Sequence, residues 1–224
     1  MNKLHQMLAL LAVAAICVAP TTATADAEHI TKSQPFWTFA APPPAGETRL
    51  VRTPQGLTAQ FKTTGLTAGH AVTLWIMFFD NPDACLTPGA CNPDIDIGRP
   101  GVRFDFHYAS GHIVNARNTT ISGHVQVGEL STSGWAELVE IGGAPPFFVT
   151  PLTNPLGAQV ILALHSHGPA QPGTALPAQM SSYLGGCQLP FLGDAAGFAQ
   201  SADDIPALPG DCSTIQVAFH MPAN

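Results

Sequence analysis

The chain has 224 residues, of which 46% are hydrophobic and only 10% charged, and it contains 21 glycines and 21 prolines. Lys and Arg total 8 against 15 Asp and Glu, giving a formal net charge of −7. The few basic residues are scattered along the chain, which argues against binding to nucleic acid or to anionic membrane surfaces. The length suits one large domain, and the abundance of turn formers is typical of a loop-rich β protein.

The N-terminus has the pattern of a secretory signal peptide. A positively charged start is followed by an apolar run over residues 7–19 and then by Ala23-Thr24-Ala25, which matches the charged region, apolar core and small-residue cleavage site of such peptides. The apolar run is shorter than the ~20 residues that cross a bilayer. We therefore expect cleavage after Ala25 and a soluble protein that is secreted or periplasmic.

Four cysteines follow the predicted signal peptide: Cys85, Cys91, Cys187 and Cys212. An even number of cysteines in an exported chain predicts two disulfides. Proximity in sequence favours the pairs Cys85–Cys91 and Cys187–Cys212, although other pairings exist. A zinc site is the alternative interpretation, but the sequence has no C-x-x-C spacing and oxidation is expected after export.

The remaining chain reads as short strands separated by turns. Residues 26–45 are predicted as an irregular leader, because Pro42, Pro43 and Pro44 exclude a helix or an interior strand. Strands are expected over residues 48–52, 57–63, 71–79, 102–108, 111–116, 119–128, 134–141, 157–165 and 213–220, with 178–184 as a strand or short helix. Residues 71–79 are apolar on both faces, which predicts a central strand covered on both sides.

This pattern predicts an all-β fold for residues 46–224, built as a single antiparallel sandwich or barrel of roughly ten short strands with long disulfide-clamped loops. The longest loop, residues 80–100, carries Asp80, Asp83, Asp94 and Asp96. We expect these acids to be solvated. Asp94-x-Asp96-x-Gly98 is only superficially similar to a calcium loop, since no glutamate closes it.

The most specific candidate for a functional motif is the pair His165 and His167 at the end of the strand 157–165. Side chains of a strand alternate between its faces, so both rings are expected on the same face. With a third ligand from His107, His124 or His112, the pair predicts a zinc or copper site with one open position. The alternative is that both rings are structural, bonded to loop carbonyls or packed against Trp75 or Tyr108.

These features support three functions. The first is a binding or structural module of the cell envelope or extracellular space, whose ligand is unknown and which holds a metal through His165 and His167 if that site forms. The second is a small secreted metal-dependent enzyme that uses the same histidines as ligands and Asp80 or Asp105 as a base. The third is a binder of small apolar ligands, with a cavity lined by Trp75, Phe78, Phe104 and Phe106. No G-x-S-x-G, Walker or dinucleotide-binding motif is present.

Several segments together resemble a family. They are Gly65-Leu-Thr-Ala-Gly-His-Ala-Val-Thr-Leu-Trp75, Phe79-Asp-Asn-Pro82 with the following cysteines, and Ala163-Leu-His-Ser-His-Gly-Pro-Ala170 with Gly185-Gly-Cys187. Over residues 48–190 the chain looks like a group of exported bacterial proteins that carry no assigned function. The stretch Leu164-His-Ser-His-Gly-Pro-Ala170 is also similar to the His-x-His-Gly-Pro-Ala signature of CHRD (chordin-type) modules. Copper–zinc superoxide dismutases carry H-x-H on a β-sandwich too, but their remaining ligand spacing is not matched. The resemblance implies an exported fold and no particular mechanism.

Overall fold

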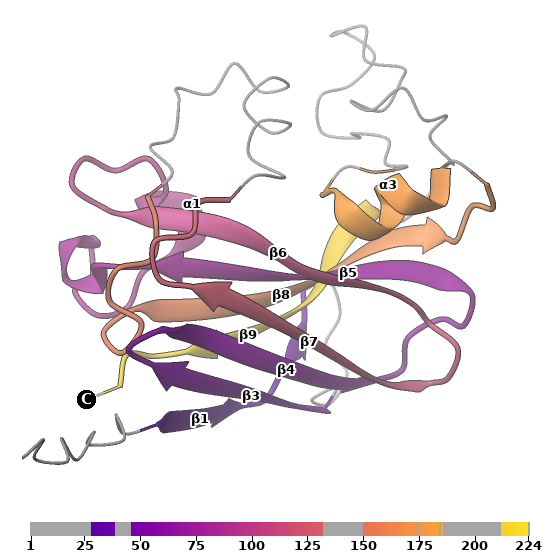
Figure 1. Cartoon of the computed structure of the whole chain (residues 1–224), viewed down its shortest axis with the longest axis horizontal. Helices are drawn as coiled ribbons and strands as arrows, with labels where there is room; N and C mark the ends of the chain where they lie inside the picture. Colours follow the sequence, from indigo (N-terminus) through magenta and orange to yellow (C-terminus); the bar gives the residue numbers. More distant parts are fainter. Residues whose placement is uncertain are drawn as a thin grey trace, which may run out of the picture.

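A computed structural model of the chain describes residues 28–38, 46–131, 150–173, 175–183, 185 and 212–223. The predicted signal peptide, the strand predicted at 134–141 and Cys187 lie outside these residues. The described backbone forms two antiparallel sheets packed face to face (Figure 1). The prediction of an all-β sandwich is therefore confirmed.

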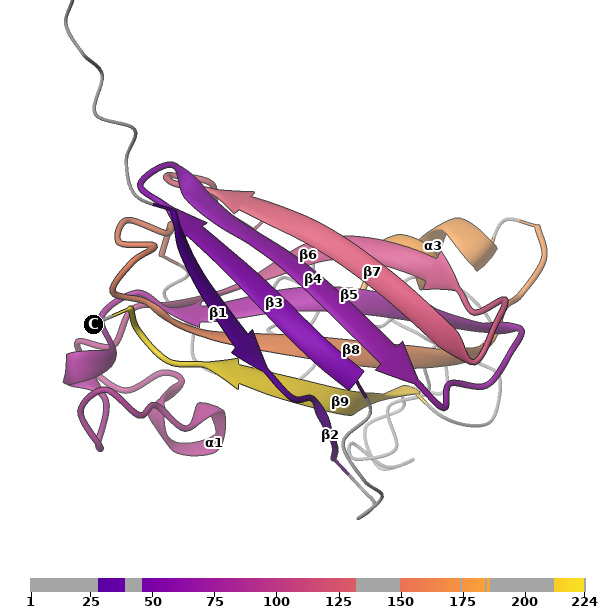
Figure 2. The same ribbon diagram turned by 90° about the horizontal axis from the view of Figure 1, so that it is seen from below.

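The two sheets have four and five strands, and Figure 2 shows the smaller one lying across the larger. The four-stranded sheet runs in the order β1 (His29–Ser33), β3 (Gly46–Thr53), β4 (Gly56–Thr64) and β7 (Asn118–Gln126). The five-stranded sheet runs in the order β2 (Phe36–Trp37), β9 (Cys212–His220), β8 (Gln159–Pro169), β5 (His70–Phe79) and β6 (Phe104–Ile113). In the larger sheet β8 and β9 lie between β2 and β5, so β2 pairs with β9 and β5 pairs with β8, which are distant in sequence.

The larger sheet is covered on both faces, as the apolar pattern of β5 predicts. Leu74, Ile76 and Phe78 point between the sheets into one buried cluster. Trp75 and Phe79, which alternate with them, belong to a second buried cluster on the outer face of the five-stranded sheet. Burial of one such side chain stabilises the fold by about 1.5–3 kcal/mol, so β5 contributes to two cores at once.

The prediction of an irregular leader is wrong for part of residues 26–45. β1 pairs in antiparallel register with β3, and β2 pairs with β9. An edge strand gains most of its stability from the ladder and the sheet that it joins, so its own sequence can be polar, as in His29-Ile-Thr-Lys-Ser33.

The predicted break between strands at 102–108 and 111–116 is also wrong, because β6 continues through Gly111. The glycine indicates a close approach rather than a turn. A Cβ atom at Gly111 would lie 2.2 Å from the carbonyl oxygen of Met180 in helix α3 (Ala175–Ser181). Glycine at this position therefore lets α3 pack directly on β6. Of the strand or short helix predicted at 178–184, it is the helix that forms.

The loop over residues 80–100 lies at the opposite end of the sheet from α3 (Figures 1 and 2). It contains the short helices η1 (Pro82–Ala84) and α1 (Pro93–Asp96) and the predicted disulfide between Cys85 and Cys91, whose Cα atoms are 5.3 Å apart. The side chain of Gln159 holds it against β8, accepting from the Cys91 N–H at 2.7 Å and donating to the Cys91 carbonyl at 2.9 Å.

Two acids of this loop are buried rather than solvated, which corrects the prediction for Asp80 and Asp96. Each side chain belongs to a residue only 1% exposed. Asp96 accepts from the backbone N–H groups of Leu86 and Asn92 at 2.7 and 2.8 Å. These two bonds, chiefly the one from Asn92, hold the pKa of the Asp96 carboxyl below its ordinary value. The acid therefore organises the loop by accepting backbone hydrogen bonds.

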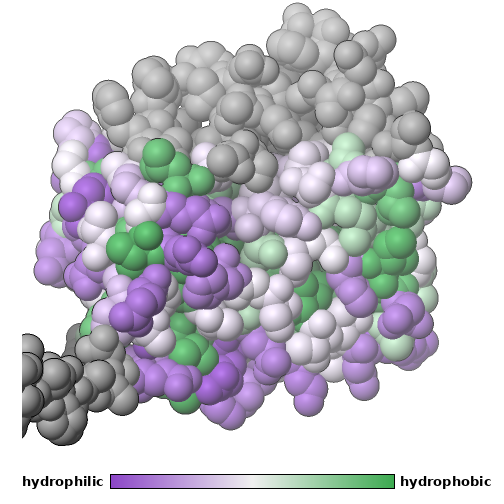
Figure 3. Space-filling view, viewed as in Figure 1, coloured by the Kyte–Doolittle hydropathy of each residue, from purple (hydrophilic) through white to green (hydrophobic). Residues whose placement is uncertain are grey.

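No helix in the described part of the chain is long and apolar enough to cross a membrane. On the face seen in Figure 3, the described residues show apolar side chains in small groups separated by hydrophilic ones.

Candidate functional site

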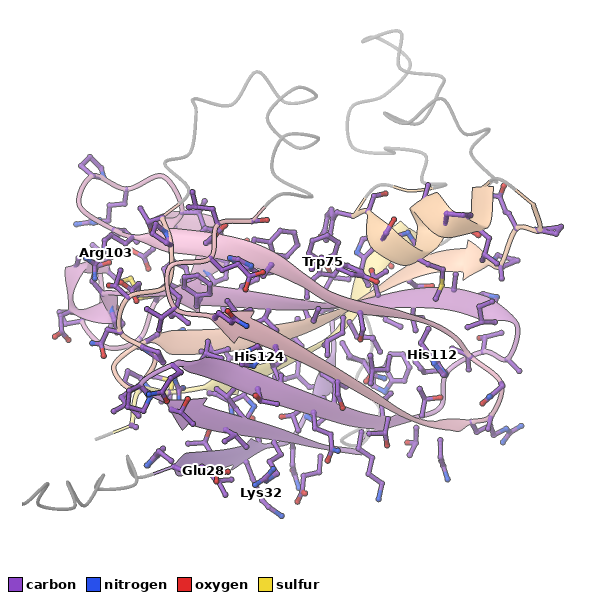
Figure 4. All side chains as sticks on the ribbon, in the orientation of Figure 1. Glu28, Lys32, Trp75, Arg103, His112 and His124 are labelled. Carbon is purple, nitrogen blue, oxygen red and sulfur yellow. A yellow bond between two sulfur atoms is a disulfide. The ribbon has the colours of Figure 1, made fainter. Side chains whose placement is uncertain are left out.

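The structure brings His165 and His167 together, and none of the three further candidates, His107, His124 and His112, joins them in a three-ligand group among the described residues. The rings of His165 and His167 lie 5.0 Å apart on the outer face of the five-stranded sheet. His107 points between the sheets and stacks on Phe78 at 5.5 Å. His124 is exposed on β7 of the other sheet (Figure 4). Among the described residues, no group of three or more His, Cys, Asp or Glu side chains could hold a metal ion.

Both ring nitrogens of His167, which is 1% exposed, have hydrogen-bond partners. Nδ1 lies 2.9 Å from the carbonyl oxygen of Gly185, and Nε2 lies 2.8 Å from Oγ1 of Thr73. A carbonyl only accepts, so Nδ1 carries the proton, and Nε2 accepts from the Thr73 hydroxyl. That hydroxyl in turn accepts from the indole N–H of Trp75 at 2.7 Å. The chain of bonds leaves no lone pair of His167 for a metal.

His165 differs from His167 because only one of its two ring nitrogens has a hydrogen-bond partner. Its Nδ1 atom lies 3.4 Å from Oγ1 of Thr214, and its Nε2 atom is buried without a hydrogen-bond partner. The ring packs against Tyr183 with centroids 4.2 Å apart. Burial, and secondarily the neighbouring His167, holds the pKa of His165 well below its ordinary value. His165 is therefore a neutral ring with one open nitrogen.

The carboxylates proposed as bases for an enzyme lie far from this pair. Asp105 is in register with Phe78 on β5, whereas His165 is in register with Thr73. Five residues along a strand span about 17 Å. Asp105 also accepts from the N–H of Phe106 at 2.7 Å and lies 2.8 Å from Nε2 of His107.

Asp80 is no better placed to act as a base. Its carboxylate accepts from the backbone N–H groups of Thr153 and Asn154 and pairs with Arg103. It lies at the 80–100 end of β5, beside an open cleft of about 730 Å³. The carboxylate fastens the loop after residue 150 and presents no uncommitted oxygen to that cleft.

Two polar residues without a role in the sequence prediction lie buried between the sheets. Arg52 is 0% exposed and donates to four backbone carbonyls, those of Pro155, Ala158, His220 and Met221. His220 lies within 2.8 and 2.9 Å of two threonine hydroxyls, from β1 and β3. Burial and the nearby Arg52 lower the pKa of His220 to about 4. No motif marks these residues, because each is an isolated polar position in a strand.

The four aromatic residues predicted to line a ligand cavity do not share one. Phe78 belongs to the cluster between the sheets, whereas Trp75, Phe104 and Phe106 pack on the outer face. Trp75 stacks on Phe106 with centroids 4.5 Å apart. The prediction of a common apolar cavity lined by these side chains is wrong, because Phe78 alternates with Trp75 along β5.

The residue that sequence reasoning missed is Ser166, which lies between the two histidines. It points to the opposite face of β8, where it lines a pocket of about 190 Å³ formed by the five-stranded sheet and the loop that follows β4. The pocket is formed by the ends of β2, β5, β8 and β9, with Trp37, Thr67, His70, Val72, Ser166 and Ser213 among its walls. The strict alternation of a strand could have shown that Ser166 opposes the histidines, but not that a pocket lies on that side.

Comparison of the chain with protein-family models, curated proteins and solved structures finds no match. The site is therefore interpreted from its own geometry.

Proposed function

We propose that the protein is a binding module of the cell envelope or extracellular space, which holds a small ligand in the pocket lined by Ser166 and uses its histidine pair as a structural element. One observation carries the proposal. At the end of β8, His165 and His167 lie on the outer face of the five-stranded sheet, where His167 is part of a buried hydrogen-bond network. Ser166 lies on the opposite face and lines the pocket.

The pocket has the features of a small-ligand site. It is concave, half of its wall is apolar, and a few polar side chains converge on it. Ser166 Oγ accepts from the Gly168 N–H at 3.3 Å, so its own proton remains to be donated. His167 on the other face has both ring nitrogens committed to protein partners.

One observation favours a metal-dependent function instead, namely the unpartnered Nε2 atom of His165. It supplies a single imidazole ligand, whereas zinc sites use three or four protein ligands. The binding function therefore has the stronger support.

Two features support the extracellular or cell-envelope location in this proposal. The sequence pattern of residues 1–25 is that expected of a signal peptide, and the disulfide between Cys85 and Cys91 suits an oxidising compartment.

A fragment screen by NMR tests the proposal. We expect some members of a panel of neutral, charged and apolar small molecules to shift the backbone amides of Thr67, Ser166 and Ser213 in a saturable manner. Ser213→Phe places a large side chain at the pocket and should abolish these shifts. Thr120→Phe, at an exposed position of β7, is the matched control and should leave them intact. Absence of saturable shifts for every fragment, or shifts that persist in Ser213→Phe, would overturn the proposal.

A further inference from the structure

We infer that the pocket between β2, β5, β8 and β9 takes a neutral, hydroxylated ring, a single pyranose unit. This inference rests on the proposed function and specifies the ligand of the same site. It follows from the size of the pocket, the absence of Lys, Arg, Asp and Glu from the described part of its walls, its uncommitted hydroxyl groups and the aromatic side chain at one side.

The volume limits the ligand to one small ring. The pocket volume of about 190 Å³ is space for several water molecules. A single pyranose fits within such a space, with part of its hydroxyl rim in solvent. A disaccharide would have to leave its second ring outside.

Among the residues that the structure describes, the walls of the pocket carry no Lys, Arg, Asp or Glu. A charged ligand would lose hydration on entering without gaining an opposite charge from these residues, which is unfavourable. The described walls therefore suit a neutral ligand.

The polar groups of the walls match the hydroxyls of a sugar. Within the described part of the chain, Thr67, His70 and Ser213 make no side-chain hydrogen bond. The hydroxyl proton of Ser166 is uncommitted as well. Hydroxyl groups both donate and accept, and an imidazole offers two ring nitrogens for hydrogen bonds, whereas sugar hydroxyls need donors and acceptors. A purely apolar ring would instead leave the proton of the buried Ser166 hydroxyl without an acceptor.

Trp37 supplies the apolar side. Its backbone is fixed in β2 by pairing with Gln216 of β9, and its ring packs against the cluster between the sheets. Gly65 lies under the same ring, since a Cβ atom there would be 3.4 Å from Cζ2 of Trp37. An indole held in this way offers a rigid apolar surface to the C–H groups of a pyranose while the hydroxyls face the polar walls.

Titration of the purified protein with methyl glucoside, methyl galactoside and methyl mannoside tests the inference, with chemical shifts of the Trp37 indole and of the Ser166 and Ser213 amides as the readout. We expect saturable binding in the millimolar range for at least one glycoside, as suits a ligand of this size. Thr67→Val and Ser213→Ala should each weaken that binding about three- to tenfold, because each removes one hydrogen bond. Thr120→Val, at an exposed position of β7 away from the pocket, is the matched control and should leave it unchanged.

Two comparison probes separate this inference from the proposed function. Cyclohexylmethanol has a similar ring without the additional hydroxyls, and methyl glucuronide adds a charge. Both should bind more weakly than the best glycoside. Saturable pocket shifts with cyclohexylmethanol and none with any glycoside would overturn the sugar assignment while supporting a binding site. Absence of pocket shifts with every probe would overturn the sugar assignment, and the fragment screen described above would then decide the proposed function.

Discussion

The two histidines of β8 should differ sharply in their contribution to stability, although they are two residues apart on the same face. Replacement of His167 by Phe removes the bonds to Gly185 and Thr73, so the Gly185 carbonyl loses this donor and the proton of the buried Thr73 hydroxyl loses its acceptor. An unsatisfied buried polar group costs about 1–3 kcal/mol, so we expect His167→Phe to lower the free energy of unfolding by about 2–5 kcal/mol.

Replacement of His165 by Phe removes a long 3.4 Å contact and also removes a buried nitrogen that has no partner. The new ring can keep the contact with Tyr183. We expect a change within about 1 kcal/mol, as for volume-conserving core substitutions. Urea unfolding followed by tryptophan fluorescence at pH 7.5 measures both variants against the parent protein. Equal losses for both, or a larger loss for His165→Phe, would refute the hydrogen-bond network assigned to His167.

Three further predictions concern the rest of the fold. The folded-state pKa of His220 is about 4 against 6.5 for the free side chain, so its contribution to stability is complete above about pH 6.5 and is lost as the pH falls towards 4. The difference amounts to about 3 kcal/mol. Urea midpoints of His220→Gln should therefore vary less between these pH values than those of the parent protein, and an unchanged pH dependence would contradict this expectation. Arg52→Lys retains the charge but cannot reach all the carbonyls that the guanidinium satisfies, so unfolding free energy should fall by about 2–4 kcal/mol; an unaltered midpoint would argue against this role. Replacing Cys85 and Cys91 together by Ala opens a short loop with a sequence separation of 6 and should cost about 2 kcal/mol. A double variant as stable as the parent would show that the hydrogen bonds of Gln159 and Asp96 hold the loop without the disulfide.

The fold class and the central strand could be predicted because they follow from local pattern. β5 is apolar on both faces, so its consecutive residues alone indicate that both of its sides are buried. β1 and the continuity of β6 through Gly111 were not predicted, since both depend on a partner distant in sequence: β3 for the first and the carbonyl of Met180 for the second.

The alternation of side chains along a strand was the only feature of the sequence from which the geometry of the site could be predicted. That alternation places His165 and His167 on one face of β8, and the structure confirms it. It does not reveal which sheet the other histidines join. His107 and His124 lie on β6 and β7, which are consecutive in sequence but belong to different sheets. A three-histidine site was therefore plausible in sequence and is not formed by these residues.

One NMR experiment that observes both faces of β8 tests the proposed function most directly. Histidine ring nitrogens and backbone amides are recorded while zinc, and separately the best glycoside, is added to the purified protein. We expect the glycoside to shift the amide of Ser166 and zinc to produce no saturable change at the ring nitrogens of His165 or His167. A saturable response of both rings to stoichiometric zinc, with Ser166 unaffected by any glycoside, would contradict the proposed function.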